Sequence, residues 1–351
     1  MPPTRYREIE VAGTPTQMGE QLGEAAREEI RGFDAVALER VTKTTAVSRE
    51  RALEAAAACL KPTRAYSPDM VAELEGMARS SGLSVEALML LQIRNQLRPD
   101  ADAGCTAFSL ATCATGSSVV GQNWDNDPAL EPFTIVLTRR PEGEPAHLHV
   151  TQAGLIAYIG LSDAGIGVCM NTLPAPSRPV GVPHYFAVRG LYGARSLDEA
   201  VAAVRRAERA IPGNVLLATP QGPADLEVTV DEVHVIRDPE GEMVTHTNHC
   251  LHPNLVALND DFPELIQSRP RKARVDALLT GAEKPLTLDA LKRILRDHDG
   301  HPTSICRHPN DHPGDGFWVS AFSVLIEADA GRMHLTRGNP CTQPYEVYSL
   351  S

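Results

Sequence analysis

The sequence changes near Pro99 from helical to β-rich character, and this change restricts the folds that the chain can adopt. Before Pro99, apolar residues such as Met18, Leu22 and Ala26 recur at the spacing of one helical face. After it, short runs of β-branched and aromatic residues are separated by Gly, Pro and Asp, and helical patterns return, for example at Leu288–Leu295. Numerous strands with helices before, between and after them predict a layered α+β architecture.

Capping and turn residues set the expected ends of these elements. Thr14-Pro15-Thr16-Gln17 has the pattern of a capping box with proline in the first helical turn. The whole of the first hundred residues is expected to be helical. The expected strands are Cys105–Ala111, Val119–Trp124, Thr134–Thr138, His147–Thr151, Leu155–Leu161, Gly165–Asn171, Val215–Ala218, Leu226–Val230, Val233–Ile236, Phe317–Ala328 and Met333–Arg337. The expected later helices are Tyr185–Tyr192, Leu197–Ala207, Arg271–Leu279 and Leu288–Leu295.

Charge and hydropathy exclude several classes of partner. The chain of 351 residues carries 33 basic and 45 acidic side chains, a net charge of −12, which disfavours binding to nucleic acid or to an anionic membrane surface. It contains no run of 18 apolar residues, so no membrane-spanning segment is expected. The N-terminal residues lack the apolar stretch of a secretory signal, which favours a cytoplasmic location.

The cysteines predict neither a disulfide framework nor a zinc knuckle. There are seven of them, widely scattered and without a C-x-x-C pair. Most are expected to be buried as small hydrophobic side chains. Cys105 differs from the others because it follows Gly104 directly, at the border between the helical and β-rich parts, after the expected turn over residues 100–104.

The next strand places polar side chains near Cys105. A hairpin turn is expected near Thr115-Gly116, and position 115 is midway between Cys105 and Asp125. Antiparallel pairing about this turn predicts Asp125 beside Cys105. Since Gln122 and Asn123 share the same strand end, the sequence predicts a thiol, a carboxylate and two amides together, which is a plausible nucleophile site.

A nucleophilic thiol here would need a base. Its usual pKa of about 8.5 leaves only a few per cent as thiolate at neutral pH. The chain has 12 histidines, but none has a decisive sequence context. The alternative is that Cys105 becomes a new N-terminus, whose amino group, with a pKa of about 7.7–8.0, takes the thiol proton. That route requires the thiol to attack the preceding carbonyl and cut the Gly104–Cys105 bond, and glycine tolerates the strained approach.

A series of short motifs extends over nearly the whole chain. Taken in this order and with these separations, they resemble the acyl-coenzyme A:6-aminopenicillanate (isopenicillin N) acyltransferase family, whose members are self-processing N-terminal-nucleophile hydrolases. The motifs are Gly13-Thr14-Pro15 with Gly19 and Gly23, Gly104-Cys105-Thr106, Gly121-Gln122-Asn123-Trp124-Asp125, Gly181-Val182-Pro183, His246-Thr247-Asn248-His249-Cys250, Ser304-Ile305-Cys306-Arg307 and Arg337-Gly338-Asn339-Pro340.

The resemblance implies a four-layer αββα sandwich and a precursor that cuts itself between Gly104 and Cys105. Residues 1–104 would remain bound as a small subunit to the catalytic subunit of residues 105–351, so that both form one domain. Cys105 resembles the nucleophile, and Asp125 the residue that orients its amino group. Asn248 resembles the amide that stabilises the oxyanion. Arg307 matches a position near the nucleophile, where a cation favours a thiolate and keeps Asp125 charged.

The substrate site is less well indicated by the sequence. Trp124, Phe317 and Trp318 are candidate walls of an acyl pocket, although core packing is the default role of both tryptophans. Gly316 and Phe317 stand where the penicillin enzyme has a serine–arginine pair, and the loss of that arginine removes a carboxylate clamp. A penicillin substrate is therefore not expected.

Two groups of histidines raise the alternative of a metallohydrolase. The first group consists of His246, His249 and His252. The second consists of His298, His301, His308 and His312, which lie among Asp297, Asp299, Asp311 and Asp315. Their spacing fits no standard zinc pattern, so no metal site is predicted. The second group is expected to be a solvated acidic loop.

These observations favour a self-processing cysteine amidohydrolase that cleaves an amide bond of a small molecule through an acyl-enzyme. The alternatives are a CoA-dependent N-acyltransferase that acts on a small-molecule amine, the metallohydrolase, and a binding protein without catalysis. A CoA thioester is a possible co-substrate of the second, and no other cofactor is expected. The expected partners are the small-molecule substrate and the chain's own cleaved N-terminal fragment.

Overall fold

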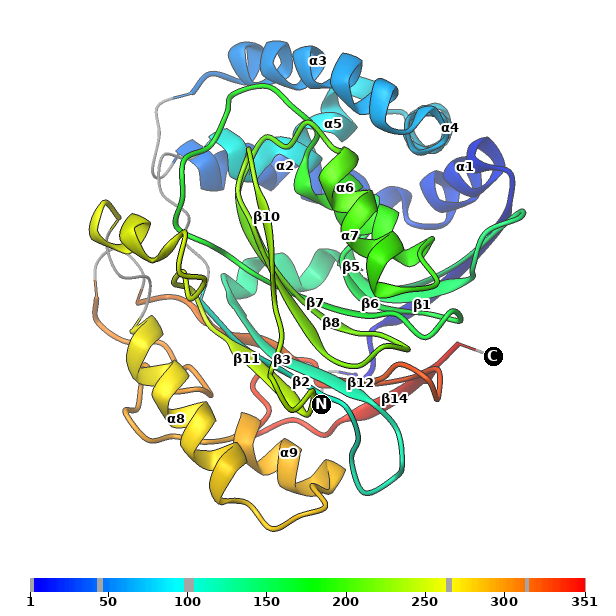
Figure 1. Ribbon diagram of the computed structural model, residues 1–351. Helices are drawn as coiled ribbons and strands as arrows, with labels where there is room; N and C mark the ends of the chain where they lie inside the picture. The colour runs from blue at the N-terminus through cyan, green and yellow to red at the C-terminus, as the bar shows by residue number, and fades with distance from the viewer. Residues whose placement is uncertain (1–2, 43–46, 98–103, 263–266, 313–315, 351) are drawn as a thin grey trace.

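Two β-sheets are stacked face to face between layers of helices in the computed structural model (Figure 1). The structure describes residues 3–42, 47–97, 104–262, 267–312 and 316–350. Helices α1–α7 lie on the side of the eight-stranded sheet, and α8 and α9 cover the six-stranded sheet. The predicted α+β fold with an αββα layering is confirmed.

The eight-stranded sheet has the order β1-β4-β5-β6-β7-β8-β9-β10. Its first strand, β1, pairs in parallel with β4, and the remaining pairs are antiparallel. The strands are β1 (Arg7–Gly13), β4 (Thr134–Pro141), β5 (His147–Gln152), β6 (Ile159–Ser162), β7 (Gly167–Asn171), β8 (Gly213–Ala218), β9 (Ala224–Val228) and β10 (Val233–Ile236).

The expectation of an entirely helical N-terminal third is wrong at β1. In this strand Ile9 and Val11 are buried while Glu8 and Glu10 are exposed, so the polar–apolar alternation of an edge strand was present in the sequence. The six-stranded sheet also has two short strands that were not expected, β11 and β14. Its order is β11 (Met243–His246), β2 (Gly104–Leu110), β3 (Val119–Asn126), β12 (Val319–Glu327), β13 (Arg332–Leu335) and β14 (Glu346–Ser349).

Side-chain caps define most of the helix starts. Thr14 and Gln17 form the predicted reciprocal capping box at the start of α1, and Ser67 and Ser84 cap the starts of α4 and α5. The helices are α1 (Pro15–Ala25), α2 (Arg27–Thr42), α3 (Arg49–Tyr66), α4 (Pro68–Ser81), α5 (Val85–Ile93), α6 (His184–Tyr192), α7 (Leu197–Arg206), α8 (Ser268–Gly281) and α9 (Leu288–Leu295), with short 3₁₀ turns at Arg94–Leu97, Pro128–Phe133 and Val256–Asp260.

The N-terminal helices are joined to the eight-stranded sheet by buried polar contacts. Glu73 of α4 accepts a hydrogen bond of 2.6 Å from Arg139 of β4, and both side chains are at most 1 % exposed. Gln92 of α5 donates to the Gly154 carbonyl (2.7 Å) and accepts from the Ile156 backbone N–H (3.1 Å). Since removing one partner of a buried ion pair costs about 3–5 kcal/mol, these contacts hold α4 and α5 against the eight-stranded sheet.

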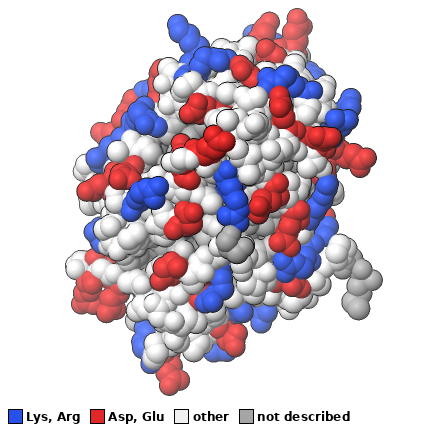
Figure 2. All heavy atoms as spheres, turned by 90° about the vertical axis from the view of Figure 1, so that its right-hand side faces the viewer, with Lys and Arg blue, Asp and Glu red and all other residues white. Residues whose placement is uncertain are grey.

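The surface matches the mixed charge of the sequence. Figure 2 shows basic and acidic side chains interspersed over one face of the molecule, without a large area of a single sign on that face. Within the described ranges of the chain, we find no helix with both the length and the apolar character needed to cross a bilayer.

Candidate active site

Cys105 lies at the start of β2, the second strand of the six-stranded sheet, which pairs with the edge strand β11 and with β3. Its side chain is 1 % exposed. The predicted register is wrong by one residue, because Cys105 pairs with Trp124 and Gly104 pairs with Asp125. The hairpin turn closes through hydrogen bonds between Cys113 and Ser117 and between Gly116 and Cys113, so the pairs are symmetric about a point just before Thr115. Asp125 therefore lies opposite Gly104, the residue before the cysteine. The rest of the expected turn, residues 100–103, is outside the described residues.

The Cys105 thiol is neutral in the uncut chain. Burial raises its pKa to about 12, and the negative charge of Asp125 adds to this increase. The positive charge of Arg271 and hydrogen bonds with the Gln122 side chain and the Asp125 backbone act in the opposite direction but are weaker. A thiol in this environment needs a local proton acceptor before it can attack a carbonyl.

Asn248 holds the backbone of Cys105. It follows β11, and its Oδ1 accepts hydrogen bonds from the Cys105 backbone N–H (2.9 Å) and from Arg271 Nη2 (2.8 Å). Its Nδ2 donates to the Thr172 carbonyl (3.1 Å), and its backbone N–H donates to Ser268 Oγ (2.8 Å). Asn248 is fully buried, so these contacts fix the amide beside the Gly104–Cys105 peptide bond.

Arg271 is a site residue that the sequence analysis missed. It projects from α8, is 2 % exposed, and donates to the Cys105 carbonyl as well as to Thr106 Oγ1 (3.0 Å) and Asn248. The signal was present, because Arg271 precedes the buried Val275 and Leu279 by four and eight residues and so shares the buried face of the expected helix. An arginine on an apolar helical face needs buried acceptors.

Asp125 is connected to Arg307 through Ser320, a second residue that was missed. Ser320 Oγ donates to Asp125 Oδ1 (2.7 Å) and accepts from the Arg307 backbone N–H (2.9 Å). Burial raises the pKa of Asp125 to about 6, although Arg271, the Ser320 hydrogen bond and Arg307 each lower it. Its second oxygen, Oδ2, is buried and has no hydrogen-bond partner among the described residues. Asp125 is thus a buried carboxylate with one acceptor atom still available.

The three predicted substrate-binding residues lie in different environments. Trp124 stacks on Phe322 with ring centroids 4.8 Å apart, and its indole N–H donates to Tyr158 Oη (2.9 Å). Trp318 is 3 % exposed, whereas Phe317 is 43 % exposed. The contacts of Trp124 are those of a core residue, and Phe317 is the surface residue of the three.

The first predicted histidine group does not converge on one point. His246 Nε2 lies 2.9 Å from Glu227, His249 Nδ1 lies 2.7 Å from Ser268 Oγ, and His252 stacks on His234. Asp225 and Glu227, rather than the other two histidines, are the neighbours of His246 that could share a metal with it.

The second histidine group divides in a similar way. His298 and His308 approach each other, whereas Asp297 pairs with Arg274 at 2.7 Å and Asp315 is outside the described residues. The expectation that this loop is purely a solvated surface is therefore incomplete, because His308 also contacts a buried cysteine, Cys306.

Comparison with known proteins decides the family. The family described as acyl-coenzyme A:6-aminopenicillanic acid acyl-transferase matches residues 113–341. The chain belongs to this acyltransferase family. The resemblance that the motifs predicted is confirmed, and the matched region includes Asp125, Asn248, Arg271 and Arg307 but begins after Cys105.

Individual proteins similar to this acyltransferase family member include one from a fungus and two from bacteria. The chain is 29 % identical to the 40 kDa form of the acyl-coenzyme A:6-aminopenicillanic-acid-acyltransferase of Emericella nidulans, over 97 % of this chain and 94 % of that protein. Among solved structures, it is similar to a conjugated bile acid hydrolase from Clostridium perfringens (14 % identity, TM-score 0.48, covering 70 % of this chain and 97 % of the other). It is also similar to a penicillin V acylase from Agrobacterium tumefaciens (10 % identity, TM-score 0.47, covering 70 % and 86 %).

Proposed function

We propose that this acyltransferase-family enzyme first cuts its own chain between Gly104 and Cys105 and then uses Cys105 to break an amide bond of a small molecule. The observation that carries the proposal is that buried polar groups hold the backbone on either side of the thiol. The Cys105 N–H donates to a side chain, Asn248, and the Cys105 carbonyl accepts from Arg271. A cysteine that only packed in the core would not need a buried arginine and an asparagine to hold its main chain.

The self-cleavage is an N-to-S acyl shift followed by hydrolysis. The Cys105 sulfur bonds to the Gly104 carbonyl carbon, the bond from that carbon to the Cys105 nitrogen breaks, and the thiol proton ends on the nitrogen. Water then cleaves the Gly104 thioester, which leaves a carboxyl group on Gly104 and restores the thiol. The products would be a small subunit of residues 1–104 and a large subunit of residues 105–351, folded together as one domain.

The released amino group then becomes the base. Its pKa of about 7.7–8.0 is closer to neutral pH than that of a side-chain amine, so a useful fraction is unprotonated and can take the thiol proton. Asn248 Oδ1 already accepts from this nitrogen at 2.9 Å. The available Oδ2 of Asp125, which lies opposite Gly104, offers a second acceptor for the ammonium form. Asp125 would thus orient the amino group, as the family resemblance implies.

Catalysis on a substrate proceeds through an acyl-enzyme. The Cys105 sulfur attacks the acyl carbon, and the Cys105 amino group carries the proton to the leaving nitrogen. Asn248 Nδ2 supplies a hydrogen bond to the oxyanion, and a donor of this kind contributes about 2.7–4 kcal/mol to transition-state stabilisation. Arg307 donates its backbone N–H to Ser320, which donates to Asp125, and the positive charge of Arg307 helps to keep Asp125 ionised.

The acyl-enzyme can be released to water or to an amine. Hydrolysis of a small-molecule amide is the first proposal, because water needs no dedicated site. Transfer from a CoA thioester to an amine is the second, and it is favoured by the family's description, which names acyl-coenzyme A. Free CoA released only when an amine is supplied would identify the transferase. CoA release without an amine, or amide turnover without CoA, would identify the hydrolase.

Intact-mass spectrometry of the purified protein tests the shared first step. We expect wild type to give two fragments of 104 and 247 residues, and Cys105→Ala to give a single chain of 351 residues. Cys169→Ala is the matched control, since Cys169 is equally buried but lies on β7, and it should be cut like wild type. An intact wild-type chain with full amidase activity would overturn the N-terminal mechanism. Failure of an electrophilic amide analogue to label Cys105 would favour a binding protein.

A further inference from the structure

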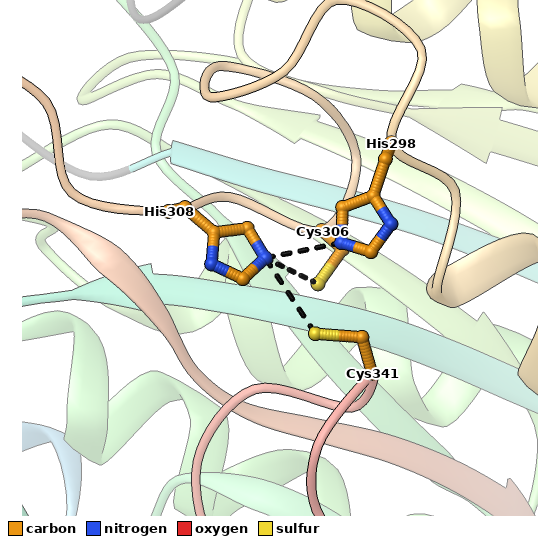
Figure 3. A group of neighbouring side chains, drawn as sticks. All are labelled: His298, Cys306, His308 and Cys341. Carbon is orange, nitrogen blue, oxygen red and sulfur yellow. Dashed lines mark hydrogen bonds between the residues drawn. The ribbon is translucent and has the colours of Figure 1, made fainter.

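Figure 3 shows a cluster of two cysteines and two histidines, and two of them, Cys306 and His308, flank Arg307 in the sequence. His308 Nε2 is 3.0 Å from His298 Nε2, 3.6 Å from Cys306 Sγ and 3.5 Å from Cys341 Sγ. All four potential ligand atoms lie within 4.8 Å of one another. Three of the side chains come from the segment after α9, and Cys341 comes from the loop between β13 and β14.

Two of these three separations match those of a tetrahedral zinc site. With Zn–S bonds of about 2.3 Å and Zn–N bonds of about 2.0–2.1 Å, tetrahedral geometry separates neighbouring ligand atoms by roughly 3.3–3.8 Å. The two sulfur-to-nitrogen distances at His308 fall within this range, and the distance between the two ring nitrogens is slightly shorter. Two thiolates with two imidazoles also form a ligand set that suits zinc well.

Hydrogen bonding alone does not account for this arrangement. One ring nitrogen of His308 faces three polar atoms, but an imidazole nitrogen carries either one hydrogen or one lone pair. It can therefore satisfy only one of its three neighbours at a time. A cation at the common centre would satisfy all four side chains together.

We propose that His298, Cys306, His308 and Cys341 bind one zinc ion in a closed, structural site. All four positions of the tetrahedron are filled by protein ligands, so the ion has no open position for a substrate or an activated water, and it is separate from the metallohydrolase alternative. Cys306 is buried and His298 is exposed, which places the site at the surface with a route for metal entry. Asn339 Nδ2 lies 3.7 Å from Cys306 Sγ, where it can donate a hydrogen bond to a zinc-bound thiolate.

The position of this zinc site gives it a role in holding Arg307. Arg307 lies between two of the ligands, Cys306 and His308, and its carbonyl accepts from Asn339 Nδ2 (2.7 Å). Its backbone N–H donates to Ser320, which in turn donates to Asp125. The zinc would cross-link the segment that carries Arg307 to the loop that carries Cys341. The site does not depend on the proposed amidase function, because its metal content can be measured in uncut or inactive protein.

Metal analysis of protein purified without a polyhistidine tag tests the proposal. We expect about one zinc per chain, and at least a tenfold lower content in Cys341→Ser and in His298→Ala. Cys113→Ser is the matched control, because Cys113 is also buried but belongs to the β2–β3 hairpin, and it should retain the zinc. Because His298 is exposed, its replacement keeps the test valid even if a cysteine variant fails to fold.

Cobalt(II) provides a second readout. Apoprotein loaded with cobalt should show the absorption of tetrahedral thiolate coordination, and Cys341→Ser should lose it while Cys113→Ser keeps it. Chelation of the metal should lower the melting temperature of wild type but not that of Cys341→Ser. Three results would overturn the proposal: wild type that binds neither zinc nor cobalt stoichiometrically, zinc content unchanged in both ligand variants, or a Cys306–Cys341 disulfide in freshly purified protein.

Discussion

Replacement of Arg271 by glutamine should separate the structural and catalytic effects of the buried polar cluster. The guanidinium donates to the Cys105 carbonyl, Thr106 Oγ1 and Asn248 Oδ1, all of which are buried. Hydrogen bonds to charged groups contribute about 1.5–3 kcal/mol each. Since Asn248 keeps its donor from Cys105, we count two lost hydrogen bonds rather than three, and we expect a loss of about 3–6 kcal/mol in the free energy of unfolding.

The same change should move the pH dependence of self-cleavage. The Arg271 charge lowers the pKa of both Asp125, which is about 6, and Cys105, which is about 12. Without that charge both pKa values rise. An acid with a pKa of 6 is about nine-tenths ionised at pH 7, and a rise of one unit reduces this to about half. The rising limb of the cleavage rate against pH should therefore shift upward in Arg271→Gln.

Two measurements check these effects. Urea unfolding, performed in a Cys105→Ala background so that every chain stays uncut, gives the stability. Intact-mass kinetics across pH, performed with Cys105 present, give the cleavage profile. Lys272→Gln on the same helix is the control, because its partly exposed pair with Asp276 is worth no more than about 1 kcal/mol. A stability loss below about 1 kcal/mol together with an unshifted pH profile would refute the role of Arg271.

Three further predictions concern other parts of the molecule. Asn248→Ala should lower kcat for amide turnover by about 10²–10³-fold with a smaller change in KM. A kcat equal to that of wild type would exclude a contact between Asn248 and the oxyanion. Gly19→Ala should destabilise the fold by about 1–3 kcal/mol in urea unfolding, because a Cβ at this position would overlap the Glu73 carbonyl at the α1–α4 crossing; an unchanged midpoint would contradict this. Burial acts to raise the pKa of Glu327, but Arg332 and His334 lower it from 4.5 to about 2. The resulting stability is present above pH 4.5 and is lost as the pH falls through about 2. The difference in the free energy of unfolding between wild type and Glu327→Gln should therefore become smaller in acid. A difference that is constant from pH 7 to pH 2 would argue against the pairing of Glu327 with Arg332 and His334.

The layered fold could be read from the sequence because its elements carry strong local signals. Leu288–Leu295 has the predicted bounds, and Thr14 caps α1 as expected. The short strands β11 and β14 were missed because each has only four residues with one or two β-branched side chains, whereas β10, which is equally short, has three and was expected. Their structure depends on pairing with β2 and β13, which is a tertiary effect.

The candidate site was predicted in part. The β2–β3 hairpin was expected, but its register depends on the turn. An error of one residue in the turn led to the prediction that Asp125 pairs with Cys105, whereas it pairs with Gly104. Arg271 and Ser320 come from α8 and β12, far from Cys105 in sequence, so only the fold brings them together. The same reason applies to the cysteine–histidine cluster, whose residues are separated by irregular intervals and whose last member, Cys341, is 33 residues beyond His308.

The strand β1 has a consequence for how the cut protein would behave. It belongs to the segment before Gly104 but completes the edge of the eight-stranded sheet by pairing along its whole length with β4. Once the peptide bond is broken, complete unfolding releases two polypeptides, and reassembly becomes a bimolecular reaction that slows on dilution. The lifetime of the folded, cut enzyme would then be set by its rate of unfolding rather than by a reversible folding equilibrium. After cutting, the protein could no longer refold as a single chain.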